Sequence, residues 1–121
     1  MPRVLAICRD PAFRQKLAQA LKAEGGFVVS TSLENTTDVL NLRLHFRPDL
    51  FVLEAPISQA VLETIVALKR ATPKTPLFLI TDRPNMQSEK EALVHGADAV
   101  FAKGSDFASL ILNARAVCGR H

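Results

Sequence analysis

The sequence predicts an α/β fold, a parallel sheet of five strands with helices on both faces. Five short apolar runs recur along the 121-residue chain, and longer segments with apolar residues at helical spacing separate them. The runs are apolar nearly throughout, which is typical of strands covered on both faces. The predicted strands are Val4–Ile7, Phe27–Ser30, Leu50–Leu53, Leu77–Ile80 and Ala99–Ala102.

Two of the intervening segments carry apolar stripes that predict core-facing helices. The stripes are Phe13, Leu17, Ala20 and Leu21, ended by Gly25 and Gly26, and then Val61, Leu62, Ile65 and Leu68.

The two helices nearest the C-terminal end differ in the width of their apolar faces. The segment Met86–His95 has a narrow face, mainly Leu93 and Val94, so we expect it to be the most loosely held helix. The last helix, from about Ser105 to Cys118, has a wider stripe that covers the sheet and leaves any surplus as a candidate dimer surface. Its members are Phe107, Leu110, Ile111, Ala114 and Val117.

Composition predicts one domain, residues 1–121, in the cytoplasm. A hydrophobic share of 48% and a charged share of 22% suffice for one core at this length. No apolar stretch approaches the roughly 20 residues that span a bilayer, and the chain starts without the pattern of a signal sequence. Cys8 and Cys118 form neither a disulfide framework nor a metal-binding spacing.

The net charge of +3 does not by itself predict a nucleic-acid or membrane partner. The basic residues are scattered along the chain without a long basic run, and the chain has no tyrosine or tryptophan on which bases would stack. We therefore expect protein partners rather than direct nucleic-acid binding.

Polar residues follow four of the five predicted strands. In open α/β folds the carboxyl ends of parallel strands meet at one edge, where binding sites form. The sequence therefore predicts one pocket at that edge. Its candidate residues are Cys8, Arg9, Asp10, Glu54, Thr81 and Lys103.

These residues and their flanks resemble the receiver domain of two-component response regulators along essentially the whole chain. The stretch Arg3–Pro11 resembles the first strand with its acidic pair, and Pro48–Glu54 resembles the stretch that ends at the phosphorylated aspartate. Pro76–Thr81 resembles the fourth strand with its hydroxyl residue, and Gly96–Lys103 resembles the approach to the invariant lysine. With right-handed crossovers, the resemblance implies a doubly wound, flavodoxin-like (βα)5 sheet of order 2-1-3-4-5.

The chain departs from the receiver pattern at three positions and keeps two. Cys8 and Arg9 stand where the family has its acidic pair, and Glu54 stands at the phosphoacceptor position, while Thr81 and Lys103 match. The family's three carboxylates and lysine carry a formal charge of −2, which suits Mg²⁺, whereas Glu54, Arg9 and Lys103 carry +1. We therefore expect a degenerate, pseudo-receiver site without Mg²⁺, without catalytic residues and without the cation that phosphoryl transfer needs.

Asp10 and Glu54 each allow two interpretations. Asp10 is favoured as the N-cap of the first helix over a role as a metal ligand, because it precedes a proline that suits the first helical turn. Glu54 either pairs with Arg9 or Lys103, or reaches Thr81 and Lys103 and imitates the phosphorylated aspartate. The two interpretations of Glu54 are compatible.

These interpretations lead to three candidate functions. The favoured one is a phosphorylation-independent, non-enzymatic interaction module. The resemblance implies that its docking face, for a partner, an output domain or a second copy, comprises the fourth helix, fifth strand and fifth helix. On that strand Val100 replaces a usually aromatic switch residue. The alternatives are a residual phosphoacceptor that uses Asp10 and Glu54, and a sensor in which Arg9, Lys103 and Thr81 hold a small anion.

Overall fold

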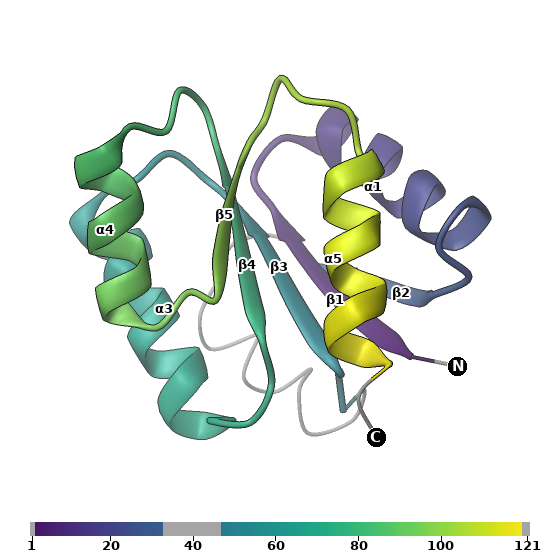
Figure 1. Cartoon of the computed structure of the whole chain (residues 1–121), viewed down its shortest axis with the longest axis horizontal. Helices are drawn as coiled ribbons and strands as arrows, with labels where there is room; N and C mark the ends of the chain where they lie inside the picture. Colours follow the sequence, from purple (N-terminus) through teal and green to yellow (C-terminus); the bar gives the residue numbers. More distant parts are fainter. Residues whose placement is uncertain (1, 33–46, 120–121) are drawn as a thin grey trace.

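The structure is a computed structural model that describes residues 2–32 and 47–119. Its sheet has five strands, all parallel, in the order β2-β1-β3-β4-β5 (Figure 1). The predicted α/β class and the predicted strand order are therefore confirmed. The stretch 33–46, which joins the second and third strands, lies outside the described residues.

The elements follow the predicted alternation of strands and helices. The strands are β1 (Arg3–Cys8), β2 (Val28–Ser32), β3 (Leu50–Glu54), β4 (Leu77–Thr81) and β5 (Ala99–Ala102). The described helices are α1 (Pro11–Ala23), α3 (Gln59–Ala71), α4 (Met86–His95) and α5 (Ala108–Cys118).

Two apolar layers pack on opposite faces of the sheet. Helices α1 and α5 cover one face, and α3 and α4 cover the other (Figure 1). Successive residues of a strand point to opposite faces, so Val4 belongs to the first layer and Leu5 to the second. All five residues of β3 and all five of β4 are buried, which explains their continuous apolar runs.

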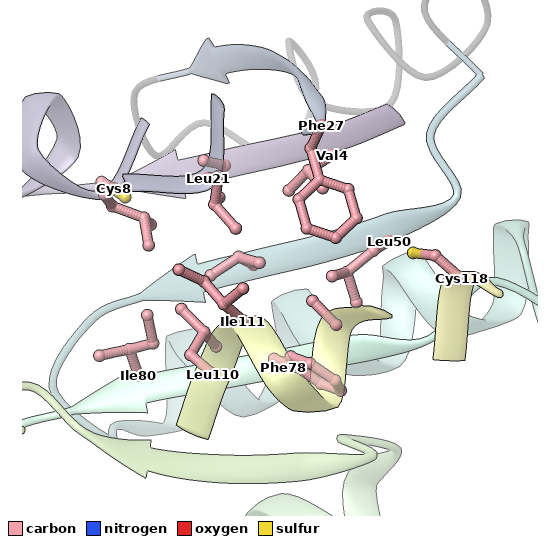
Figure 2. Packing of buried hydrophobic residues seen from close by; sticks show 14 of the residues in the cluster. Val4, Cys8, Leu21, Phe27, Leu50, Phe78, Ile80, Leu110, Ile111 and Cys118 are labelled. Carbon is pink, nitrogen blue, oxygen red and sulfur yellow. The ribbon is translucent and has the colours of Figure 1, made fainter. Parts of the chain in front are cut away.

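The layer under α1 and α5 contains both cysteines. Figure 2 shows Leu110 and Ile111 of α5 against the side chains of the central strands, with Cys8 and Cys118 near opposite ends of the cluster. Both thiols are buried and free.

The core stripes of α1 and α3 lie where the sequence predicts them, with one shift in α1. Val61, Leu62, Ile65 and Leu68 of α3 are all buried. In α1, Ala18 is buried in the core and Ala20 is only partly buried against it. Methyl groups at neighbouring helical positions have nearly the same hydropathy, so the sequence pattern alone does not separate them.

The narrow apolar face of α4, mainly Leu93 and Val94, is not the side that packs on the sheet. Leu93 is 48% exposed and Val94 is 74% exposed, and the one buried residue of this helix is Ala92. A small side chain lets α4 approach the sheet closely, and the larger apolar residues then face outward. No helix within the described residues is long and apolar enough to cross a membrane.

The last helix begins later than predicted, at Ala108. Its buried residues are Leu110, Ile111, Ala114 and Cys118, whereas Phe107 and Val117 of the predicted stripe pack only partly against the core. The large apolar side chain that α5 exposes is Leu112, at 69% exposure, which lies outside the predicted stripe.

Candidate functional site

The six candidate residues lie at or just after the carboxyl ends of β1, β3, β4 and β5, along one edge of the sheet. Cys8 and Glu54 are partners in the register between β1 and β3, so they lie side by side. Thr81 ends β4, and its carbonyl accepts the backbone N–H of Lys103 at 2.9 Å, which fixes the start of the loop after β5. Arg9 and Asp10 lie in the link between β1 and α1.

Glu54 is a buried carboxylate whose two oxygens both have donors from this chain. The residue is 3% exposed. Its Oε1 accepts the backbone N–H of Asp10 at 3.0 Å, and its Oε2 lies 3.5 Å from Nζ of Lys103. Lys103, one of the two predicted partners for Glu54, lies beside it. Arg9, the other, has an exposed side chain.

Lys103 lies between two carboxylates and is closer to Asp10. Its Nζ donates to Oδ2 of Asp10 at 3.0 Å, and this contact, with the charge of Glu54 in a smaller role, raises the pKa of Lys103 despite partial desolvation. Nζ also lies 5.3 Å from the ring centroid of Phe13, within the range of a cation–π contact. The ammonium group is thus held from several sides.

Asp10 has two roles, one on each carboxylate oxygen. Oδ1 accepts the backbone N–H groups of Ala12 at 3.0 Å and Phe13 at 3.3 Å, so the prediction of an N-cap is confirmed. Oδ2 holds Lys103, and this hydrogen bond is the main reason that the pKa of Asp10 lies below its usual range.

The second role of Asp10 adds a carboxylate to the charges at this edge of the sheet. The predicted charge of +1 counted Glu54, Arg9 and Lys103 and left Asp10 out. Two carboxylates and one ammonium make up the contacting cluster, so Asp10, Glu54 and Lys103 together carry a formal charge of −1. We call these three residues the Lys103 cluster.

Cys8 contributes a neutral thiol to this edge of the sheet. The residue is fully buried, and burial, followed by the nearby Glu54 carboxylate, raises the pKa of the Cys8 thiol to about 12. A thiol that remains protonated at neutral pH is a poor nucleophile and a poor metal ligand.

Thr81 and Val100, the remaining positions singled out from the sequence, lie on strands beside the cluster. Thr81 is 4% exposed at the end of β4. Val100 is half-buried on β5 and packs against the layer under α3 and α4.

No protein-family model and no curated protein matches this chain. Solved structures do match it over nearly their whole length. A two-component response regulator from Clostridium difficile has a TM-score of 0.86 and 23% identity, covering 99% of this chain and 98% of that one. The receiver domain of the response regulator NarL from Mycobacterium tuberculosis has a TM-score of 0.84 and 20% identity over 99% and 98%.

A third similar structure is a Burkholderia pseudomallei protein whose name relates it to pilus assembly. Its TM-score is 0.87 and its identity 17%, over 98% of this chain and 90% of that one. The chain has the receiver-domain fold. At these identities the likeness establishes the fold and leaves the chemistry of the site to its own residues.

Within this receiver fold, the feature that sequence reasoning missed is the link between α1 and β5 through Asp10 and Lys103. The two residues are 93 positions apart in the chain. The sequence contains a signal for this link. An aspartate that caps a helix uses one carboxylate oxygen and leaves the other available to a lysine at the same edge of the sheet.

Proposed function

We propose that this chain is an atypical, pseudo-receiver domain of a two-component-type signalling system, which acts through protein contacts without being phosphorylated. The observation that carries the proposal is the state of Glu54. One of its oxygens has a backbone donor and the other faces an ammonium group, so a phosphoryl donor would have to displace both. The position serves as an internal ion-pair partner rather than as an acceptor.

The donor set around Glu54 does not fit Mg²⁺, which the receiver fold usually implies. Mg²⁺ prefers several oxygen ligands in octahedral arrangement. Here the neighbour of Glu54 on β1 is a protonated thiol, and Asp10 is already engaged by Lys103 and by the start of α1. In residues 2–32 and 47–119 no group of three or more histidine, cysteine, aspartate or glutamate side chains is placed to hold a metal ion.

The same contacts argue against the two alternative functions. A residual phosphoacceptor would use Asp10 and Glu54 as metal ligands, yet both carboxylates are held on Lys103. An anion sensor would use Lys103 as a donor, yet an incoming anion would meet the two carboxylates already there. The contacts within the Lys103 cluster therefore disfavour the binding of a cation and of an anion.

The surface of α4 is the most apolar candidate for a docking face. Of the five large hydrophobic side chains that are exposed in the described part of the chain, Met86, Leu93 and Val94 belong to this helix. Beside it, β5 forms the edge of the sheet, and all four of its residues are partly exposed. We propose that α4 and β5, with the adjoining side of α5, bind a partner protein or a second copy.

The experiment that tests the proposal is the intact mass of the chain after incubation with a small-molecule phosphodonor and Mg²⁺. We expect no phosphoryl adduct on the native chain. A triple variant, Cys8→Asp with Arg9→Asp and Glu54→Asp, supplies the three carboxylates of the family pattern and is expected to gain an acid-labile adduct. Glu63→Asp, on the exposed side of α3, is the matched control for the change of side-chain length.

Two outcomes would contradict the proposal. An acid-labile adduct on the native chain that disappears in Glu54→Gln would make Glu54 a working acceptor. Tight Mg²⁺ binding by the native chain, measured by calorimetry and lost in the same variant, would show that the Lys103 cluster opens to a cation.

A further inference from the structure

A cavity of about 180 Å³ lies between β5, the start of α5 and the start of α1. It is separate from the surface of α4 and opens beside the Lys103 cluster. Its apolar walls come from four elements and the loop before α5. They are Phe13, Ile80, Phe101, Phe107 and Leu110.

We propose that this cavity binds a small molecule with a single aromatic ring and one hydrogen-bond donor, of the phenol class. The first support is size. An engineered apolar cavity of roughly 150 Å³ binds one benzene molecule in another protein, so this cavity has room for one ring. A chain segment or a large cofactor would not fit.

The second support is the chemistry of the walls. Phe13 and Phe107 already meet edge to face, with centroids 5.7 Å apart, and Phe101 is tilted against Phe78 at 5.3 Å. An incoming ring can extend this arrangement, because aromatic pairs favour edge-to-face and offset contacts. Phe101 and Phe107 are only partly buried, so a bound ring would also remove exposed apolar surface from water.

The third support is the polar rim, which favours a ligand that donates a hydrogen bond over a ligand that carries a negative charge. Asp106 and Ser109 line the cavity beside Lys103 and offer oxygen acceptors to a hydroxyl or ring N–H. Lys103 does not favour a ligand carboxylate, because Asp10 and Glu54 already lie within 3.0 and 3.5 Å of its Nζ. A ring acid would therefore meet the Asp106 carboxylate and an ammonium group that two other carboxylates already neutralise.

The cavity is held open by contacts that do not depend on a ligand. The ion pair with Asp10 fixes the Lys103 side chain on one side, and Oδ1 of Asp106 accepts the N–H of Ala108 at 3.0 Å on the other. We therefore expect the site to be formed before binding, with little reordering of the loop between β5 and α5.

The test is a titration of the native chain with phenol, followed by NMR of its backbone amides and phenylalanine rings. We expect saturable shifts confined to residues around the cavity and a dissociation constant lower for phenol than for benzoate. Shifts scattered over the surface, or no shift at millimolar phenol, would overturn the proposal. Tighter binding of benzoate than of phenol would overturn the assignment of the rim.

Variants on α5 provide matched controls. Ser109→Phe places a ring at the rim and is expected to weaken phenol binding at least about tenfold. Ala116→Phe adds the same side chain at an exposed position of the same helix outside the cavity, and should leave the affinity within about twofold. Equal weakening by both variants would place the phenol elsewhere.

A variant that enlarges the cavity keeps the proposal testable even if Ser109→Phe does not fold. Phe107→Ala removes one ring from the wall and should raise the affinity for the two-ring indole relative to phenol. An unchanged ratio would exclude this cavity as the site. None of these measurements requires a partner protein or a phosphodonor, so the result stands apart from that of the proposed function.

Discussion

Helices α1 and α4 both leave the carboxyl edge of the sheet, yet different contacts hold them. Helix α1 buries four side chains, and its N-cap Asp10 shares its carboxylate with Lys103. Helix α4 buries Ala92 alone, and its N-cap Asn85 exchanges hydrogen bonds with Ser88 in a capping box. The first helix is anchored in the core and in the site, whereas the second buries one side chain and has its cap contacts within its own first turn.

This difference shows that the residues that stabilise the fold and the residues that are exposed to a partner lie on different helices. A change in the Lys103 cluster reaches α1 directly through Asp10. A change on the outer side of α4 touches neither the cluster nor the core, which leaves Met86 and Val94 available for partners.

The largest expected effect comes from truncating a leucine in each helix. Leu17 of α1 is fully buried, so Leu17→Ala should lower the free energy of unfolding by about 3 kcal/mol through lost burial and a residual cavity. Leu93 of α4 is 48% exposed, so Leu93→Ala should cost less than about 1 kcal/mol. Urea unfolding of both variants measures the contrast, and equal losses would mean that α4 is as firmly packed as α1.

The caps provide the next test. Asn85→Ala removes the side-chain acceptor for the Ser88 N–H, which lies 2.8 Å away, and should cost about 1 kcal/mol. We expect the loss to be local, with faster hydrogen exchange in the first turn of α4 and unchanged exchange in α1. Faster exchange in both helices would show that the two are coupled.

Much of the fold follows from the sequence because the strands and two helices carry redundant signals. Runs such as Leu50–Leu53 are apolar and short, and the stripe of α3 repeats over its whole length. The packing of α4 does not follow from its hydropathy, because Leu93 and Val94 are exposed while Ala92 is buried. Hydropathy ranks side chains by size and polarity, whereas packing here selects the small one.

The sequence predicts that the candidate residues meet at the carboxyl edge of the sheet, but it predicts their ion pairs only in part. Strand ends identify Glu54 and Lys103 because parallel strands finish together. The link between Asp10 and Lys103 depends on how a lysine side chain crosses from β5 to the start of α1, which no pattern of spacing specifies. The exposure of Arg9 likewise depends on where the chain turns after β1.

The pH dependence of stability tests whether Asp10 is coupled to Lys103. The pKa of Asp10 is lowered in the folded chain, so its contribution is present above its ordinary value of 3.8 and is lost as the pH falls through the folded pKa. The pKa of Lys103 is raised, so its contribution is present below 10.5 and is lost as the pH rises through the folded value.

The measurement is thermal unfolding between pH 3 and 7 of the native chain and of Asp10→Asn, which keeps a capping oxygen but removes the charge. The native chain should be more stable than Asp10→Asn at pH 7, and the difference in stability between the two should shrink toward pH 3. In a Lys103→Met background most of this pH-dependent difference should vanish. A difference of the same size in that background would mean that Asp10 stabilises the chain as a cap alone.

The smallest effect on stability, and the sharpest test of the contrast, is expected for Val94→Lys. Val94 is 74% exposed, so the free energy of unfolding should change by less than about 0.5 kcal/mol. If α4 forms a contact between copies, the native chain should gain mass with concentration in light scattering, and Val94→Lys should reduce that gain by placing a charge in an apolar interface. Gln19→Lys adds the same charge to the exposed side of α1 and should leave the self-association unchanged. If the α1 variant instead weakened self-association as much as Val94→Lys, the contact would depend on net charge and α4 would lose its distinction as the docking helix.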